Sequence, residues 1–404
     1  MKILVWGINY APETAGIGPC NTALCEYLRA AGHEVEMVTT FPYYPAWQKR
    51  PEDRGAIWRR EVRQGVLVHR CWHYVPARVR WWKRIIHEST FILTSFPRVL
   101  TRPRPDLIIA VSPPLLLGPA AWLVSRLRRT RYLFHVQDLQ PDAALGVGLL
   151  KESLFTRAIY AVEAFAYRHA WRVSGISRGM LAAFSAKGVP AARQLYFPNG
   201  IRLEPPPPPG AFRHRQSFAP DNFLVVYSGN IGVKQRLQVL VQAARLLRND
   251  RICIVICGDG AQRKLIESEA AGLGNVRMLP LQPQPEYREM LRDCDLAIIT
   301  QLAGSGQAFF PSKLLNPLAH GRPVLSVADA DSEVAIALAE GGCGCNVLPD
   351  RPEELAAALE RLAGEPQQLE AWGRAGRAWV EQFEQGRVLA EFAEHLPGDG
   401  LDAL

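Results

Sequence analysis

Short apolar runs alternate along the chain with longer segments in which apolar residues recur at helical spacing. The first run, Lys2–Trp6, has no polar position after Lys2, which is typical of a strand buried on both faces. Between Leu24 and Ala31, apolar residues recur at i, i+3, i+4 and i+7, and Gly32 ends the predicted helix. Glu34–Thr39 supplies the next strand. The pattern therefore predicts a β–loop–α–β unit.

The same alternation continues in both halves of the chain. Further strands are predicted at Asp106–Ser112, Tyr132–Asp138, Val173–Ser177, Phe223–Tyr227, Ile252–Cys257, Asn275–Leu279, Leu296–Thr300 and Pro323–Val327. Five consecutive prolines at 205–209 suit an extended, semi-rigid linker. We therefore expect two doubly wound, Rossmann-like α/β domains, 1–204 and 205–404, with the last helices able to pack back on the first domain. Two such domains facing each other would enclose a cleft.

The two halves carry opposite net charge. Residues 1–200 contain 27 Lys and Arg against 13 Asp and Glu, a net charge of +14, whereas residues 201–404 contain 20 against 26, a net charge of −6. The 404-residue length is sufficient for two cores, and the 48% hydrophobic composition argues against disorder. Opposite signs indicate that the two domains have different partners.

Cysteine spacing and terminal sequence predict an intracellular protein without a metal site. The eight cysteines are scattered and lack two matching ligand pairs, so we expect reduced thiols and no zinc. The first strand runs directly into Gly7, unlike the long apolar region of a secretory signal. The apolar segment Val111–Val124 is interrupted by prolines and is too short to span a bilayer of about 30 Å.

The loop after the first strand is rich in glycine. Gly16 and Gly18 would let the backbone come close to a bound group. However, a third glycine of the dinucleotide fingerprint is missing, and no acidic residue ends the following strand. A nicotinamide cofactor is therefore disfavoured.

The strand predicted at Tyr132–Asp138 ends in polar residues, where open α/β sheets place their ligands. His135 and Asp138 are candidates for acid–base chemistry at this end. A histidine within a strand is also compatible with a hydrogen-bonded core residue, and both interpretations of His135 stay open at this point.

Three loops that follow predicted strands in the second half share glycines, lysines or helix starts. They contain Gly229, Asn230 and Lys234, then Gly258 and Gly260, then Ser312 and Lys313. Free backbone N–H groups and lysines favour an anion, most simply a diphosphate. The alternative is that these are ordinary connections of a parallel sheet.

Basic and aromatic side chains interleave before the third predicted strand. Residues 49–104 hold 14 Lys and Arg against 4 Asp and Glu. Their centre contains Arg78, Arg80, Trp81, Trp82, Lys83 and Arg84. The segment favours an anionic membrane surface or a lipid-linked substrate. A solvated surface and single-stranded nucleic acid are the weaker alternatives, and nucleic acid is not expected as a partner.

The whole chain resembles the family 4 glycosyltransferases, which have the GT-B fold of two Rossmann-like domains. The resemblance rests on Asn9–Glu13 with Gly16-Ile-Gly18, Phe197–Gly200, Ser228–Gly232 with Lys234, Gly258–Gly260, and Pro311–Leu314 leading to Gly321–Val324. Within the family, the chain is most similar to the colanic acid biosynthesis type, which builds a lipid-linked exopolysaccharide repeat.

The resemblance implies a role for each matching residue. Lys234 would neutralise the leaving diphosphate, and Asp138 and His135 would face the transferred sugar or the acceptor hydroxyl. The donor would be bound by Gly16, Gly18, Asn199, Gly229, Asn230, Lys234, Gly258, Gly260, Ser312, Lys313, Leu314, Asn316 and Glu333. Family members retain anomeric configuration and usually need no metal, because positive side chains and helix dipoles stabilise the departing nucleotide. The resemblance thus implies no metal and no cofactor besides the nucleotide-sugar co-substrate.

The chain departs from the family pattern at several of these positions. Two glutamates that many members carry correspond to Ala308 and Asn316, and Pro317 follows at once, where it could distort the first turn of a helix. The frequent His-Asp pair is Gln137-Asp138. Glu333 is a candidate for the remaining carboxylate near the nucleotide.

We expect a retaining hexosyltransferase that uses a nucleoside-diphosphate sugar and a lipid-linked saccharide at the cytoplasmic face of the membrane. A nucleotide-sugar 2-epimerase of the same fold is a second hypothesis, although it would not need a basic amphipathic segment. A catalytically degenerate, nucleotide-binding scaffold is a third, motivated by Ala308 and Asn316.

Overall fold

The computed structural model describes residues 1–78, 80–142, 153–304 and 312–397. The chain divides into two compact units, residues 1–200 with 385–404 and residues 201–384. The first boundary therefore precedes the predicted position 204. The helix at 385–394 belongs to unit 1, as the sequence analysis allowed when it expected the last helices to pack back on the first domain. The second unit therefore ends at residue 384 and not at 404.

Unit 1 is built on an eight-stranded sheet in the order β3-β4-β2-β1-β5-β6-β7-β8. The strands in this order are β3 (Trp58–Arg63), β4 (Val66–Cys71), β2 (Glu34–Thr40), β1 (Lys2–Trp6), β5 (Leu107–Ser112), β6 (Arg131–Val136), β7 (Arg172–Gly175) and β8 (Gln194–Tyr196). All neighbours are parallel except β3 and β4. Parallel pairing follows from the apolar runs, because both faces of such strands are covered by helices.

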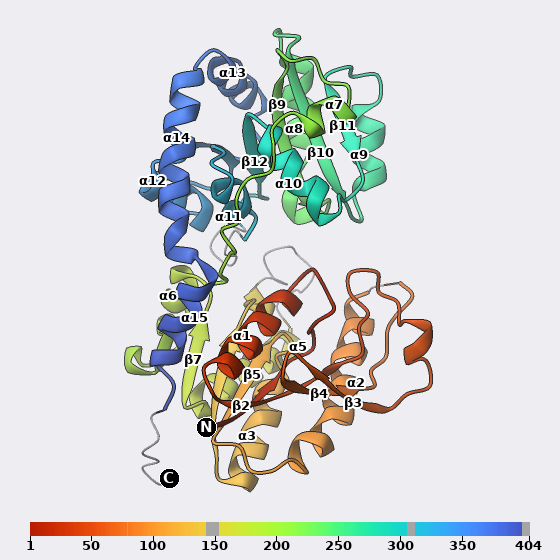
Figure 1. The fold of residues 1–404 in the computed structure, drawn as a ribbon, viewed down its shortest axis with the longest axis vertical. Helices are drawn as coiled ribbons and strands as arrows, with labels where there is room; N and C mark the ends of the chain where they lie inside the picture. Colours follow the sequence, from red (N-terminus) through yellow and green to blue (C-terminus); the bar gives the residue numbers. More distant parts are fainter. Residues whose placement is uncertain (79, 143–152, 305–311, 398–404) are drawn as a thin grey trace. The chain divides into compact units, whose positions relative to one another are not determined.

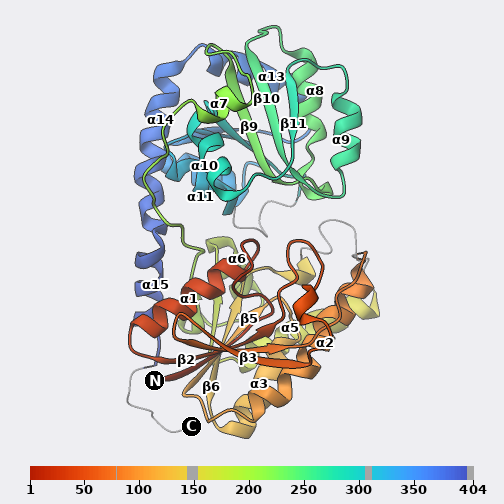
Figure 2. The same cartoon turned by 45° about the vertical axis from the view of Figure 1, so that its right-hand side comes forward.

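Helices pack on both faces of this sheet (Figures 1 and 2). They are α1 (Gly18–Ala30), α2 (Trp81–Leu100), α3 (Leu117–Arg128), α5 (Leu154–His169), α6 (Arg178–Ala186) and α15 (Gln385–Glu394). The single 3-10 turns of the unit are η1 (Pro51–Asp53) and η2 (Ala191–Arg193). Serine side chains cap α5 and α6, where Ser153 accepts from the Thr156 N–H and Ser177 from the Met180 N–H. These caps satisfy N–H groups that have no partner within the helix.

The return of α15 to unit 1 depends on aromatic stacking. Phe392 lies 1% exposed and stacks on Phe197, with ring centroids 4.0 Å apart and an interplanar angle of 21°. At Gly200 a Cβ would lie 2.8 Å from the Gln385 Cα, so the chain end approaches the first boundary closely. The C-terminal helix is thus part of the core of unit 1.

Unit 2 is built on a six-stranded parallel sheet in the order β11-β10-β9-β12-β13-β14. The strands in this order are β11 (Val276–Leu279), β10 (Ile252–Asp259), β9 (Phe223–Asn230), β12 (Leu296–Thr300), β13 (Val324–Val327) and β14 (Gly344–Val347). The predicted strands of this half are therefore present, and β9 and β10 extend two or three residues farther into their loops than predicted.

The helices of unit 2 form two layers, because alternate strand residues point to opposite faces of the sheet. One layer contains α8 (Gln238–Leu246), α9 (Arg263–Ala270) and α13 (Pro352–Ala363). The other contains α7 (Ala211–Arg215), α10 (Gln284–Asp293), α11 (Ser312–Ala319) and α12 (Glu333–Gly341). The remaining elements are η3 (Val233–Gln235), α14 (Pro366–Trp379) and η5 (Val380–Phe383). The predicted α/β fold class, with two parallel-sheet domains, is confirmed.

We predict that Phe392→Ala destabilises unit 1 by about 3–5 kcal/mol, the usual cost of removing a fully buried phenylalanine ring. Thermal and urea unfolding would measure the change. Glu391→Ala is the matched control on the same helix, because its ion pair with Arg387 is exposed and such pairs contribute little. Equal unfolding midpoints for the two variants would contradict a core role for α15.

Candidate functional site

The glycine loops of unit 2 pack against each other more closely than side chains would allow. The register pairs Gly258 with Gly229 and Asp259 with Asn230, so the β9–β10 pairing continues to the ends of both strands. A Cβ on Gly258 would lie 1.8 Å from the Gly229 carbonyl oxygen, and one on Gly260 would lie 2.4 Å from the Ile231 oxygen. The two backbones come so close at the carboxyl end of the sheet that only glycine fits at 258 and 260.

Lys313, in the first turn of α11, lies against the same glycine loop. A Cβ on Gly229 would lie 2.6 Å from the Lys313 Cε and 2.8 Å from its Nζ. The Lys313 Nζ donates to the Tyr227 hydroxyl at 2.7 Å. Burial lowers the pKa of Lys313 to about 8. The structure thus brings together the predicted residues Gly229, Gly258 and Lys313, which come from β9, β10 and α11.

Lys234 lies on η3, the single turn that follows the β9 loop. Its carbonyl oxygen accepts from the Leu302 N–H at 2.8 Å, and the Gln235 carbonyl oxygen accepts from the Thr300 hydroxyl at 2.5 Å. The Gln235 side chain in turn accepts from the Gly232 N–H at 3.1 Å and from the Asn230 amide at 3.3 Å. The turn that carries Lys234 is therefore fixed to both the glycine loop and the end of β12.

The other predicted donor residues of unit 2 have different surroundings. Leu314 is fully buried in the core, so only its backbone could contact a ligand. Asn316 lies partly exposed on α11, and this helix, Ser312–Ala319, continues across Pro317. Glu333 begins α12, where Ser332 caps the helix. Ala308 and the side chain of Ser312 lie outside the described residues.

In unit 1, His135 is the centre of a buried hydrogen-bond chain. Its Nδ1 lies 2.8 Å from the Ser174 Oγ, and its Nε2 lies 2.8 Å from the Gln137 amide nitrogen. Since that amide donates, Nε2 accepts and Nδ1 carries the proton. Burial lowers the pKa of His135 to about 3. Both ring nitrogens are thus engaged in a neutral ring, which favours the structural interpretation of His135 over a direct role in proton transfer.

The same chain fixes Asn199, a predicted donor residue that lies in unit 1. Its amide nitrogen donates to the Gln137 Oε1 at 2.9 Å, and its Oδ1 accepts from the Gln137 amide at 3.0 Å. Two side-chain amides that pair in this way hold each other's orientation. Gln137, in place of the frequent family histidine, therefore connects His135 with Asn199.

The first glycine loop packs on protein groups of its own unit. A Cβ on Gly16 would lie 3.2 Å from the Tyr44 ring, and one on Gly18 would lie 3.2 Å from the Glu13 Cβ. The buried Glu13 carboxylate accepts from the Tyr43 and Tyr44 N–H groups, both at 2.9 Å, and from the Asn9 amide at 2.8 Å. The packing of this loop within unit 1 is by itself sufficient to require small residues at 16 and 18, without a bound ligand.

Asp138 and Arg84, both named in the sequence analysis, lie near Glu88, which was not predicted. Arg84 donates to the Glu88 Oε1 at 3.0 Å, and the Gln140 amide donates to the same oxygen at 3.3 Å. Burial raises the pKa of Glu88, and the charge of Asp138 raises it further. A carboxylate pair with one arginine, after β6 and on α2, can bind and orient a polyhydroxylated group.

Aromatic rings of unit 1 lie beside this cluster, where Tyr43 and His87 are close enough to Arg84 to interact with its charge. The Tyr43 ring contacts His73 and His87, with centroids 4.9 and 4.7 Å away, and Trp47 lies 5.2 Å from His87. Burial lowers the pKa of His87 to about 4, so the ring is neutral near pH 7. The signal in the sequence was weak, because these residues come from three separate loops and helices.

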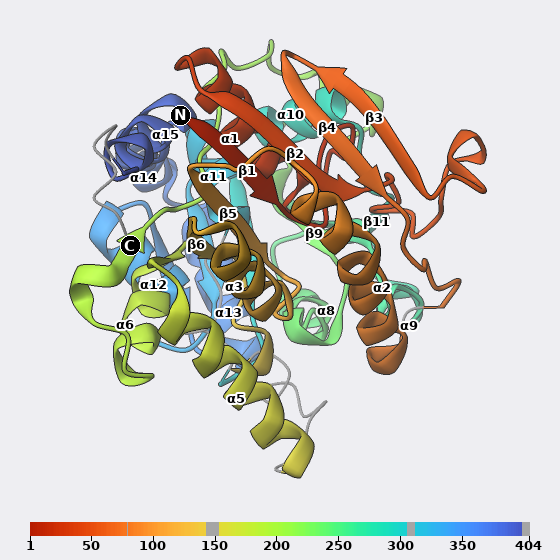
Figure 3. The same cartoon turned by 90° about the horizontal axis from the view of Figure 1, so that it is seen from below.

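The basic aromatic segment begins α2 and leaves apolar side chains in solvent. Trp82, Ile85, Ile86 and Leu93 are 43%, 39%, 42% and 72% exposed. Arg78 and Arg80 are exposed, as is Arg84, and Lys83 is half-buried; the side chain of Trp81 is not among the described ones. The helix extends along one side of the sheet of unit 1 (Figure 3). Such an apolar stripe beside basic residues is typical of an interaction surface.

Among the described residues, no group of three or more His, Cys, Asp or Glu side chains could hold a metal ion. Across the same ranges, no helix has both the length and the apolar character needed to cross a membrane.

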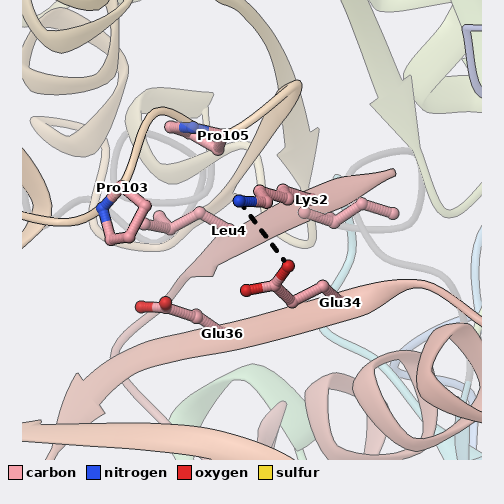
Figure 4. Close-up of a pocket in the computed structure, with 7 residues that line it drawn as sticks. Lys2, Leu4, Glu34, Glu36, Pro103 and Pro105 are labelled. Carbon is pink, nitrogen blue, oxygen red and sulfur yellow. Dashed lines mark ion pairs between the residues drawn. The ribbon is translucent and has the colours of Figure 1, made fainter.

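A shallow hollow lies between β1, β2 and the segment before β5 (Figure 4). Lys2 and Glu34 line it, with 3.8 Å between the Lys2 Nζ and the Glu34 Oε2. These residues begin their strands, whereas the candidate residues follow strand ends. The hollow is thus at the opposite end of the sheet from the candidate site.

Comparison with known proteins supports the family resemblance over nearly the whole chain. The chain matches the Glycosyl transferase 4-like domain over residues 15–200 and the Glycosyl transferases group 1 domain over residues 211–379. It is 33% identical over 419 residues to an Escherichia coli K12 protein named as a colanic acid biosynthesis glycosyl transferase, WcaI, covering 98% of this chain and 100% of the relative. The chain belongs to the family 4 glycosyltransferases. It is therefore a transferase enzyme by family.

Solved structures agree with the GT-B fold. Sucrose-phosphate synthase from Thermosynechococcus elongatus superposes with a TM-score of 0.77 at 17% identity, covering 97% of each chain. The Anabaena protein HepE, solved in complex with UDP-glucose, superposes with a TM-score of 0.70 at 16% identity, covering 98% of each chain. At such identities the likeness establishes the fold of this glycosyltransferase.

Proposed function

We propose that this glycosyltransferase moves a hexose-type sugar, with retention of configuration, from a nucleoside-diphosphate sugar to a lipid-linked saccharide in exopolysaccharide synthesis. The observation that carries the proposal is the convergence of Gly229, Gly258 and Lys313 at the carboxyl end of the unit 2 sheet. The name of the WcaI relative supports polysaccharide synthesis, and the UDP-glucose complex of HepE supports a nucleotide-sugar donor.

On the donor side, the proposed ligand is the diphosphate. Glycines at these strand ends would let a phosphate approach the backbone closely, and Lys313 adds a positive charge beside Gly229. Lys234, on its fixed turn, would neutralise the leaving nucleoside diphosphate as the glycosidic bond breaks. Lys313 and Lys234 would together provide charge stabilisation of the kind a metal ion supplies elsewhere, so we propose a metal-independent reaction.

On the acceptor side, the proposal uses unit 1. Asp138, Arg84 and Glu88 would orient the acceptor saccharide and its reacting hydroxyl, and His135 would hold the Gln137–Asn199 pair that follows the same strand. The exposed apolar side chains of α2 and the basic residues around them would bind the anionic inner face of the cytoplasmic membrane. This arrangement would bring the enzyme to acceptors that cannot leave the bilayer.

A direct test combines binding with product analysis. UDP, GDP, ADP and dTDP are screened by thermal shift, and the matching labelled nucleotide sugars are then incubated with membranes that contain lipid-linked saccharides. We expect a shift with one nucleotide, label in the lipid fraction, and the donor's anomeric configuration in the product. No shift with any nucleotide would contradict the donor site. Binding without transfer would favour the scaffold, and an altered hexose released without acceptor would favour the epimerase.

We predict that Gly229→Ala weakens nucleoside-diphosphate binding at least tenfold, because its Cβ would displace Lys313. Isothermal titration calorimetry would measure the change. Gly272→Ala is the matched control, since Gly272 also has a positive φ, +84°, but an added Cβ meets nothing within 4 Å. An equal loss in both variants would show backbone strain alone and would count against the role of Lys313.

We also predict that the double variant Ile86→Ser/Leu93→Ser lowers binding to phosphatidylglycerol vesicles about tenfold, because each serine removes apolar area from the exposed face of α2. Co-sedimentation at low salt would measure it, where attraction between basic residues and lipid is least screened. Leu265→Ser/Leu281→Ser is the control, since these leucines of unit 2 are 45% and 55% exposed. Unchanged binding by the α2 variant would contradict membrane contact there.

A further inference from the structure

Tyr227 is a core residue whose hydroxyl reaches the glycine loop. Its ring is fully buried within the apolar layer under α8, on strand β9. The hydroxyl donates to the Asn230 carbonyl oxygen at 2.6 Å, three residues farther along the strand. Burial raises the pKa of Tyr227, so the hydroxyl keeps its proton for this bond. A buried phenol of this kind fixes the path of the loop that follows β9.

The same hydroxyl is the acceptor for Lys313. The Lys313 Nζ lies 2.7 Å from the Tyr227 oxygen and 4.7 Å from the centroid of its ring. A phenol oxygen and a π face both attract a cation, which offsets part of the desolvation of the ammonium. Tyr227 therefore joins Lys313, from α11, to the Asn230 backbone through one oxygen atom.

Gly229 completes the arrangement. The Lys313 Nζ lies 2.8 Å from the position that a Gly229 Cβ would occupy, so the ammonium fills the space left by the missing side chain. An anion bound against the Gly229 backbone would meet this charge directly. The position of the charge depends on Tyr227, because the lysine chain itself has four rotatable bonds.

We propose that Tyr227 is a positioning residue that holds the Lys313 ammonium over the Gly229 backbone for the diphosphate of the sugar donor. The inference rests on the proposed function, since it takes a nucleoside diphosphate as the ligand. Tyr227 acts through Lys313 and the loop rather than by touching the ligand.

The contact also sets how donor binding depends on pH. With a pKa of about 8, Lys313 is charged below that pH, and affinity that depends on its charge is lost as pH rises above it. Removal of the Tyr227 oxygen removes a group that favours the charged form, so the pKa of Lys313 would fall further. Loss of affinity would then begin at lower pH.

The experiment is a double-mutant cycle of Tyr227→Phe and Lys313→Met, with calorimetric titration of the nucleoside diphosphate that binds the wild-type enzyme. We expect Tyr227→Phe to weaken binding about tenfold at pH 7.5, Lys313→Met at least as much, and the double variant no more than Lys313→Met. The titrations are repeated from pH 6.5 to 9.5. The affinity of the wild type should fall above about pH 8, and the affinity of Tyr227→Phe should begin to fall at a lower pH. The affinity of Lys313→Met should show no such fall.

Tyr132→Phe is the matched control. Tyr132 is likewise buried, and its hydroxyl donates to the Ala166 carbonyl oxygen at 2.9 Å within unit 1. This variant should bind as the wild type does, with the same pH profile. Wild-type affinity in Tyr227→Phe, additive losses in the double variant, or an unshifted pH break would each overturn the inference. A wild type that binds no nucleoside diphosphate would instead overturn the proposed function, and the inference with it.

Discussion

The close approach of the β9 and β10 loops is the constraint on which the candidate site of unit 2 depends. The two strands stay in register through Gly229 and Gly258, and the Gly258 carbonyl oxygen accepts from the Arg263 guanidinium, which also donates to the Leu279 oxygen at 3.0 Å. Since no side chain fits between these backbones, the loops present peptide groups rather than side chains. Positive charge then comes from residues beside these glycines: Lys313 on α11 lies against Gly229, and Lys234 lies on η3.

Unit 1 uses the same sheet topology differently. At the end of β1, the Glu13 carboxylate already occupies the N–H groups of Tyr43 and Tyr44. An internal anion thus fills the kind of backbone position that a phosphate would take in unit 2. The strand ends of unit 1 instead carry rings, amides and an arginine beside carboxylates, which suit hydroxyl groups. One architecture therefore offers two unlike surfaces, in keeping with a reaction that has two substrates.

The sequence predicted those elements whose signals are local. Continuous apolar runs identified β1 and β9, because a strand that is buried on both faces is apolar at consecutive positions. By contrast, β3 and β4 were missed: β3 reads Trp-Arg-Arg-Glu-Val-Arg and lies at the sheet edge, where charged side chains prevent further pairing. The polyproline run suggested a domain boundary near 204. It could not show that the C-terminal helix returns to unit 1, where Phe392 stacks on Phe197.

The residues of the candidate site were likewise predicted only where their signals in the sequence are local. Glycines and Lys313 could be read from motifs, but the partner of Lys313 is 86 residues away, and nothing local to Tyr227 marks it as more than a core tyrosine. His135 was ambiguous because a histidine in a strand has the same pattern whether it titrates or not. Only its burial, with Ser174 and Gln137 on its two nitrogens, resolves the ambiguity.

Gly229 and Lys313 share a single volume, since the lysine stem passes where a side chain at 229 would stand. A side chain at 229 would therefore displace the end of the lysine chain. A relative with a side chain at the first position would hold its lysine elsewhere or draw its positive charge from another element. Within the family, these two positions should vary together, so that the residue at 229 indicates which element supplies the charge.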